Sequence, residues 1–130
     1  MPVQTPEIEE KVEIDPEIWS EIQEERQVIV HCTFFNHYTE AMGIRVWKST
    51  FLICDESGHR SALIRAFNIP YQPQWMWLYP AQSHTFTMVF EALPKGCTSF
   101  TFKEVIKESG AFIVSGIARN KKDVYKIRLD

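Results

Sequence analysis

The sequence lacks the motifs by which many enzymes and metal sites are recognised. Its 130 residues include only five glycines and no glycine-rich phosphate-binding loop. The nucleophile elbow G-x-S-x-G and the zinc motif H-E-x-x-H are both absent. We therefore expect no catalytic residues, no cofactor and no bound metal, which makes this chain a non-enzyme.

A concentration of positive charge is missing as well. Fourteen Lys and Arg residues stand against 17 Asp and Glu residues, which gives a net charge of −3 and a pI near 5.8. Lys121 and Lys122 form the one adjacent basic pair. Proteins that bind the phosphate backbone of nucleic acids carry a basic patch, so we expect no nucleic-acid partner.

Long apolar runs are missing too. None approaches the roughly 18 residues that span a bilayer, so we expect no membrane span. Residues 1–15 have neither the basic nor the apolar region of a signal peptide. A mature form whose signal had been removed would look the same.

Cysteine is scarce, and its spacing is uninformative. Cys32, Cys54 and Cys97 form no C-x-x-C pair, so the spacing of thioredoxin-like and common zinc sites is absent. Free cysteines are usually buried as small apolar residues, and we favour that interpretation for all three. One disulfide with one spare thiol is the alternative, in an oxidising compartment.

The chain reads as one domain with an N-terminal extension. Residues 1–14 hold two prolines and several glutamates, which predicts an extended or disordered acidic arm. Asp15-Pro16-Glu17 is a typical helix start, and it predicts a short helix over about 15–25. The single domain is expected over 15–130.

Alternating apolar and polar residues dominate from Gln27 onward. The pattern predicts about seven or eight strands separated by turns, and the connections are too short for crossover helices. We therefore predict an all-β, antiparallel immunoglobulin-like sandwich in preference to a closed barrel. The expected strands are 28–35, 44–55, 60–69, 75–79, 84–91, 99–103, 112–117 and 124–129.

One aromatic block has a functional character. Tyr71, Trp75, Trp77 and Tyr79 share odd-numbered positions, so they would lie on one face of an extended segment. If the core takes the opposite face, the four rings form a candidate binding surface. If the rings instead face the core, they are core packing residues, which is the commoner role of large aromatics.

Other chemistry-bearing residues have ordinary explanations. Ser57 and His59 fall on a predicted turn, where polar residues serve conformation. His31 and His37 lack a third ligand nearby. The acidic side chains occupy turns or solvent faces, and nothing singles out a catalytic pair.

The C-terminal half resembles a known module. The run Phe86 to Glu104, with its F-E-A-L-P and T-S-F-T-F-K-E segments, is followed by F-I-V-S-G-I at Phe112 to Ile117. This pattern, over Arg45 to Arg119, resembles immunoglobulin-like β-sandwich modules of unknown function in bacterial cell-envelope proteins. Thr101 stands where those modules carry an acidic residue. The resemblance implies an accessory or binding module without catalytic residues, in the periplasm or cell envelope.

These observations favour a non-catalytic binding or accessory module that recognises a protein or glycan partner through an exposed sheet edge or through Tyr71, Trp75, Trp77 and Tyr79. Two alternatives stay open. One is a small hydrolase-like enzyme with a convergent site around Ser57, His59 or a carboxylate pair, and the other is a structural subunit that self-associates through sheet edges. The sequence does not indicate an oligomeric state.

Overall fold

A computed structural model describes residues 26–107 and 110–129 of the chain. The predicted arm over 1–14 and the predicted helix over about 15–25 lie outside the described residues. Within the described part no helix is long and apolar enough to cross a membrane. The strands are β1 (Val28–Phe35), β2 (Met42–Ile44), β3 (Thr50–Cys54), β4 (Arg60–Phe67), β5 (Met76–Leu78), β6 (Ser83–Phe90), β7 (Ser99–Glu104), β8 (Ile113–Ala118) and β9 (Val124–Leu129).

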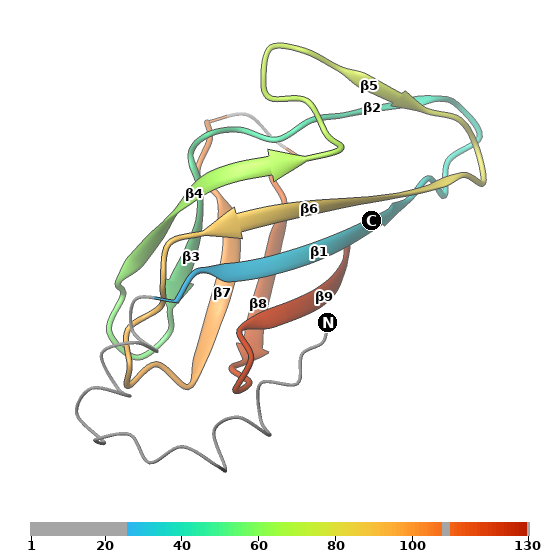
Figure 1. The fold of residues 1–130 in the computed structure, drawn as a ribbon. Coiled ribbons are helices and arrows are strands. Elements are labelled where there is room, and N and C mark those ends of the chain that lie inside the picture. Colours follow the sequence, from blue (N-terminus) through green and yellow to red (C-terminus); the bar gives the residue numbers. More distant parts are fainter. Residues whose placement is uncertain (1–25, 108–109, 130) are drawn as a thin grey trace.

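Seven of these strands form one sheet, in the order β8-β7-β3-β4-β6-β1-β9. The other two, β2 and β5, pair with each other in a small ribbon that extends from the sheet (Figure 1). The all-β class is thereby confirmed. The sheet is mixed, however, because β1 runs parallel to β9 while it runs antiparallel to β6. The prediction of purely antiparallel pairing is therefore wrong, and the immunoglobulin-like sandwich is not confirmed.

The sheet folds over on itself at β4. Residues 60–62 of this strand pair with β3, whereas Leu63–Phe67 pair with β6. The register shifts between Leu63 and Arg65, and such irregularities bend a strand and increase its twist. The half containing β3, β7 and β8 consequently faces the half containing β6, β1 and β9 (Figure 1).

Aromatic side chains fill the space between the two halves. Phe90 on β6 meets Phe102 on β7 edge to face, with ring centroids 6.0 Å apart. Phe100 on β7 meets Tyr125 on β9 in the same way at 4.9 Å. Because β7 and β9 lie near opposite ends of the strand order, this second contact shows that the sheet nearly closes into a barrel.

The predicted strand over 44–55 is interrupted in the structure. β2 ends at Ile44 and β3 begins at Thr50. Between them Val46 is buried and bridges to Tyr71. The β-branched and aromatic residues of this stretch favour extended backbone, but they belong to two different sheets: β2 to the small ribbon and β3 to the main sheet. The described residues therefore hold nine strands in place of seven or eight.

The core packing gives a first prediction. Phe102→Ala removes a fully buried ring that packs against Phe90, and we expect it to lower the free energy of unfolding by about 3–5 kcal/mol. Urea denaturation followed by tryptophan fluorescence measures the change. Ile64→Ala, at an exposed position of β4, is the matched control and should cost less than about 1 kcal/mol. Equal losses in the two variants would contradict this description of the core.

Candidate functional site

One surface feature is the aromatic face of β5 and its flanks. Leu78 is buried and Met76 packs partly against the core. The alternate residues Trp75, Trp77 and Tyr79 are 50%, 59% and 61% exposed. The face opposite the rings thus packs against the core. Of the two arrangements that the sequence allows, the structure has the one in which these rings are exposed. We call these three rings the aromatic surface.

Gly43 on β2 lets the aromatic surface form. Trp77 lies opposite Gly43 in the β2–β5 register, and Trp75 lies over the same glycine. A Cβ atom built on Gly43 would come within 2.8 Å of Cε3 of Trp75. The two indole rings stand 6.2 Å apart with an interplanar angle of 33°. The missing side chain of Gly43 is therefore what admits the Trp75 ring.

Tyr71 takes a different role from the other three predicted residues. Its hydroxyl accepts a hydrogen bond of 2.8 Å from the Ala66 amide on β4, and its ring packs partly against the core. Tyr71 therefore ties the chain before β5 to the main sheet. Three of the four predicted binding residues share the exposed surface, and the fourth supports it.

Sequence reasoning missed a cation at this surface. The Arg45 guanidinium carbon lies 3.7 Å from the Trp75 ring centroid and 5.2 Å from that of Trp47. Arg45 also donates to the Pro73 carbonyl at 3.3 Å. A guanidinium held over indole rings is a stabilising cation–π arrangement. Arg45 and Trp47 lie in the stretch that was predicted as continuous strand, so no local signal marked them.

Buried Asn36 fixes the ribbon to the end of β1. Its side-chain amide donates to the carbonyls of Glu40 and Leu78, each at 2.9 Å. Its side-chain oxygen accepts from the Tyr38 amide at 2.8 Å. Since buried polar groups are costly unless they are hydrogen-bonded, these contacts hold β5 in place, and they orient the loop carrying the exposed Tyr38 ring.

A recess of about 250 Å³ opens beside the ribbon, and Trp47, Trp75 and Phe112 are among its lining residues. Glu104, which is almost fully buried, also lines it. The Glu104 carboxylate accepts hydrogen bonds from the amides of Phe112 at 3.0 Å and Trp47 at 3.4 Å. Burial raises the pKa of Glu104, and these amides partly oppose that shift. The carboxylate thus joins the chain around β2 to β7 and β8.

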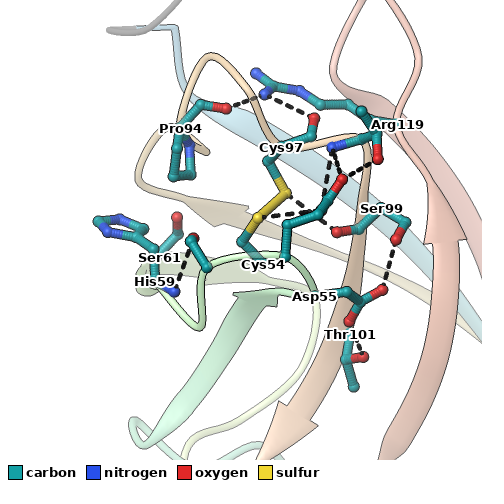
Figure 2. Close-up of a disulfide and its surroundings, with 12 residues drawn as sticks. Cys54, Asp55, His59, Ser61, Pro94, Cys97, Ser99, Thr101 and Arg119 are labelled. Atoms are coloured by element: carbon teal, nitrogen blue, oxygen red, sulfur yellow. Dashed lines mark hydrogen bonds between the residues drawn. A yellow bond between two sulfur atoms is a disulfide. The ribbon is translucent and has the colours of Figure 1, made fainter.

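The three cysteines separate into a pair and a single thiol. Cys54 and Cys97 form a disulfide with Cα atoms 5.9 Å apart (Figure 2). Cys32 is free and buried within β1, and burial raises the pKa of its thiol to about 12. The favoured interpretation, three free buried cysteines, is therefore wrong for two of them, and the alternative of one disulfide with a spare thiol is what the structure shows.

An ion pair spans the β8–β9 connection beside the disulfide. The Arg119 guanidinium contacts both carboxylate oxygens of buried Asp123 at 3.1 Å. The Asp123 carboxylate also accepts a 2.8 Å hydrogen bond from the Tyr125 hydroxyl. In addition, Arg119 donates to the carbonyls of Pro94 and Cys97 (Figure 2). This network joins the β8–β9 connection to the loop that carries Cys97.

The remaining candidates stay apart from one another. The Ser57 hydroxyl accepts from the backbone amide of His59 at 3.2 Å, a contact that does not involve the imidazole. Nδ1 of His31 pairs with the Thr87 hydroxyl at 2.8 Å across the β1–β6 ladder. Neither His31 nor His37 belongs to a cluster of three possible metal ligands within the described residues.

Comparison with known proteins adds nothing to this geometry, since no family model, curated protein or solved structure matches the sequence.

Gly43 gives a prediction for the aromatic surface. Gly43→Ala should push the Trp75 ring from its place, because the new methyl group would lie 2.8 Å from that ring. We expect a changed near-UV circular dichroism spectrum and a shifted tryptophan emission maximum. Gly96→Ala is the control, since a Cβ there meets no atom within 4 Å. Spectra of Gly43→Ala that match those of the control would contradict the close approach.

Tyr125 gives a prediction for pH dependence. Burial, together with the hydrogen bond to the Asp123 carboxylate, raises the pKa of Tyr125 to about 12. The ordinary tyrosine pKa is about 10, so the unfolded chain loses this proton first and stability falls as the pH rises from about 10 to about 12. Tyrosinate absorbance immediately after a pH jump should show a late ionisation that Tyr125→Phe removes. A late ionisation that persists in Tyr125→Phe would contradict the assignment.

Proposed function

We propose that this chain is a non-catalytic binding module that recognises a protein partner through the aromatic surface of Trp75, Trp77 and Tyr79. The observation that carries the proposal is the exposure of all three rings at alternate positions of one short ribbon. Clustered apolar side chains on a surface mark interaction sites more often than rings that occur singly.

The composition of the surface matches that of binding hot spots. Tryptophan, tyrosine and arginine are the residue types enriched among the side chains that dominate binding energy. Here Arg45 lies against Trp75, and the Tyr38 ring is exposed on the loop that Asn36 fastens to β5. A partner would thus meet large side chains that are already held by intramolecular contacts, which lowers the entropy lost on binding.

The ribbon also offers backbone groups. β2 and β5 pair only with each other in the described structure, so each has one edge without a ladder partner there. An extended peptide can add to such an edge, gaining main-chain hydrogen bonds while its side chains contact the neighbouring rings. This combination favours a protein partner over a glycan, which would use the rings but not the strand edge.

The resemblance to immunoglobulin-like modules of bacterial cell-envelope proteins supports the same class of function. Those modules accompany other domains without an established activity of their own. An accessory role in the periplasm or cell envelope is part of this proposal, and the Cys54–Cys97 disulfide suits an oxidising compartment.

The test uses a phage-displayed library of random peptides selected on the oxidised protein. A synthetic peptide from the selection should bind with a Kd that Trp77→Ala weakens about tenfold or more, the effect of removing a hot-spot residue. Fluorescence anisotropy of the labelled peptide measures the Kd. Ile113→Ala, on exposed β8, is the matched control and should leave the Kd unchanged.

A glycan array probed with the same proteins separates the two kinds of partner. Glycan binding that depends on Trp77, without any selected peptide, would replace the protein partner with a glycan. Peptide binding that is indifferent to Trp77→Ala and Tyr79→Ala would contradict the assignment of this surface.

A further inference from the structure

The end of the molecule at the β3–β4 turn holds a second constellation. The sulfur atoms of Cys54 and Cys97 and a carboxylate oxygen of Glu56 all lie within 4.8 Å of one another. Two cysteines and a carboxylate are a ligand set that zinc accepts. In the structure the two sulfurs are joined as a disulfide, and this occupies them.

The backbone around the two cysteines is held by contacts other than the disulfide. Cys54 ends β3, and its amide donates to the His59 carbonyl at 2.9 Å across the turn. The Cys97 amide donates to the Pro94 carbonyl at 3.0 Å. The two segments are joined where the Asp55 amide donates to the Ser99 carbonyl at 3.0 Å.

Side chains strengthen this connection. The Asp55 carboxylate accepts hydrogen bonds from the hydroxyls of Ser99 at 2.7 Å and Thr101 at 2.9 Å (Figure 2). Arg119 donates to the Cys97 carbonyl at 3.3 Å. Cleavage of the disulfide would therefore leave Cys54 and Cys97 facing each other across a fixed gap.

The third ligand is oriented in the manner of metal-binding carboxylates. The Thr98 hydroxyl donates to Oε2 of Glu56, and the Thr98 amide lies 3.0 Å from the same oxygen and 3.3 Å from Oε1. Oε1 stands 3.4 Å from the sulfur of Cys54. Thr98 thus contacts both carboxylate oxygens, and Oε1 also faces the sulfur, so the carboxylate has the outer support that metal ligands need.

We propose that reduction of the Cys54–Cys97 disulfide converts this corner into a zinc site whose ligands are Cys54, Glu56 and Cys97, with the fourth position open. A thiol reductant supplies two electrons and two protons: its own two thiols become a disulfide, and the S–S bond becomes two S–H groups. Zn²⁺ then displaces both thiol protons and forms two Zn–S bonds and one Zn–O bond. The metal does not change its oxidation state.

Small molecules have a route to this corner. Cys97 and Thr98 line a cavity of about 320 Å³ that also reaches Arg119 and Asp123. Arg119 is paired there with Asp123, and Arg26, Lys95 and Lys121 also line the cavity. The disulfide form is metal-free, and the dithiol form binds metal. The site therefore reports the redox state of its surroundings.

The test compares zinc binding by the oxidised protein with binding by protein that was reduced with a phosphine and freed of reductant under argon. Competition with a chromophoric chelator should show one zinc ion per reduced chain and none per oxidised chain. Cobalt in place of zinc should give a thiolate charge-transfer band in the reduced protein only. Cys32→Ala should bind as the unmodified chain does, because Cys32 lies outside the cluster.

Glu56→Gln tests the third ligand, and it leaves the disulfide able to form. We expect zinc affinity of the reduced protein to fall at least about tenfold, with Glu40→Gln, on the β1–β2 connection, as the unaffected control. The proposal is overturned if the reduced chain binds no more zinc than Cys54→Ser/Cys97→Ser, or if oxidised and reduced proteins bind equally. Unchanged affinity in Glu56→Gln would remove Glu56 from the site.

Discussion

The contact between the two halves of the folded sheet is the constraint on which the rest of the molecule depends. The Phe90–Phe102 and Phe100–Tyr125 pairs join strands that the ladder order separates. These contacts place the loop before β7 against the β8–β9 connection, where Arg119 donates a hydrogen bond to the Cys97 carbonyl. At the other end of the molecule, the same core packing sets the direction of β1, which ends next to Asn36, the residue bonded to β5. Both sites therefore depend on one aromatic core.

The two ends of the molecule differ in their chemistry. The β2–β5 ribbon offers large rings and a cation, which suits recognition of another macromolecule. The β3–β4 turn offers sulfur and carboxylate, which suits redox chemistry and metal binding. Reduction would also remove a cross-link between residues 43 apart in sequence, worth roughly 4 kcal/mol in the chain-entropy description. Zinc bound to the reduced pair would restore a link between the same two segments.

The sequence allowed the strands to be predicted well where one face is buried throughout. Val28, Val30, Cys32 and Phe34 alternate with half-buried residues along β1, and period-two patterning of this kind is a local property. Pairing partners are not local. Nothing near Val124 shows that β9 lies parallel to β1, and nothing near Cys54 selects Cys97 over Cys32. The sequence predicts exposure of Trp77 and Tyr79 only as one of two options. Which face is exposed depends on whether Leu78 packs into the core, and that is a tertiary contact.

The parallel pairing of β1 with β9 has a consequence for synthesis of the chain. Val30 on β1 is paired with Tyr125 on β9, so among the described strands this edge of β1 has no neighbour until residues up to Leu129 have left the ribosome. During that interval the nascent chain presents an eight-residue strand rich in Val, Ile and Phe, a template for pairing with other chains. Completion of the main sheet thus waits for the synthesis of β9, and chaperones have most reason to bind this protein just before that strand emerges.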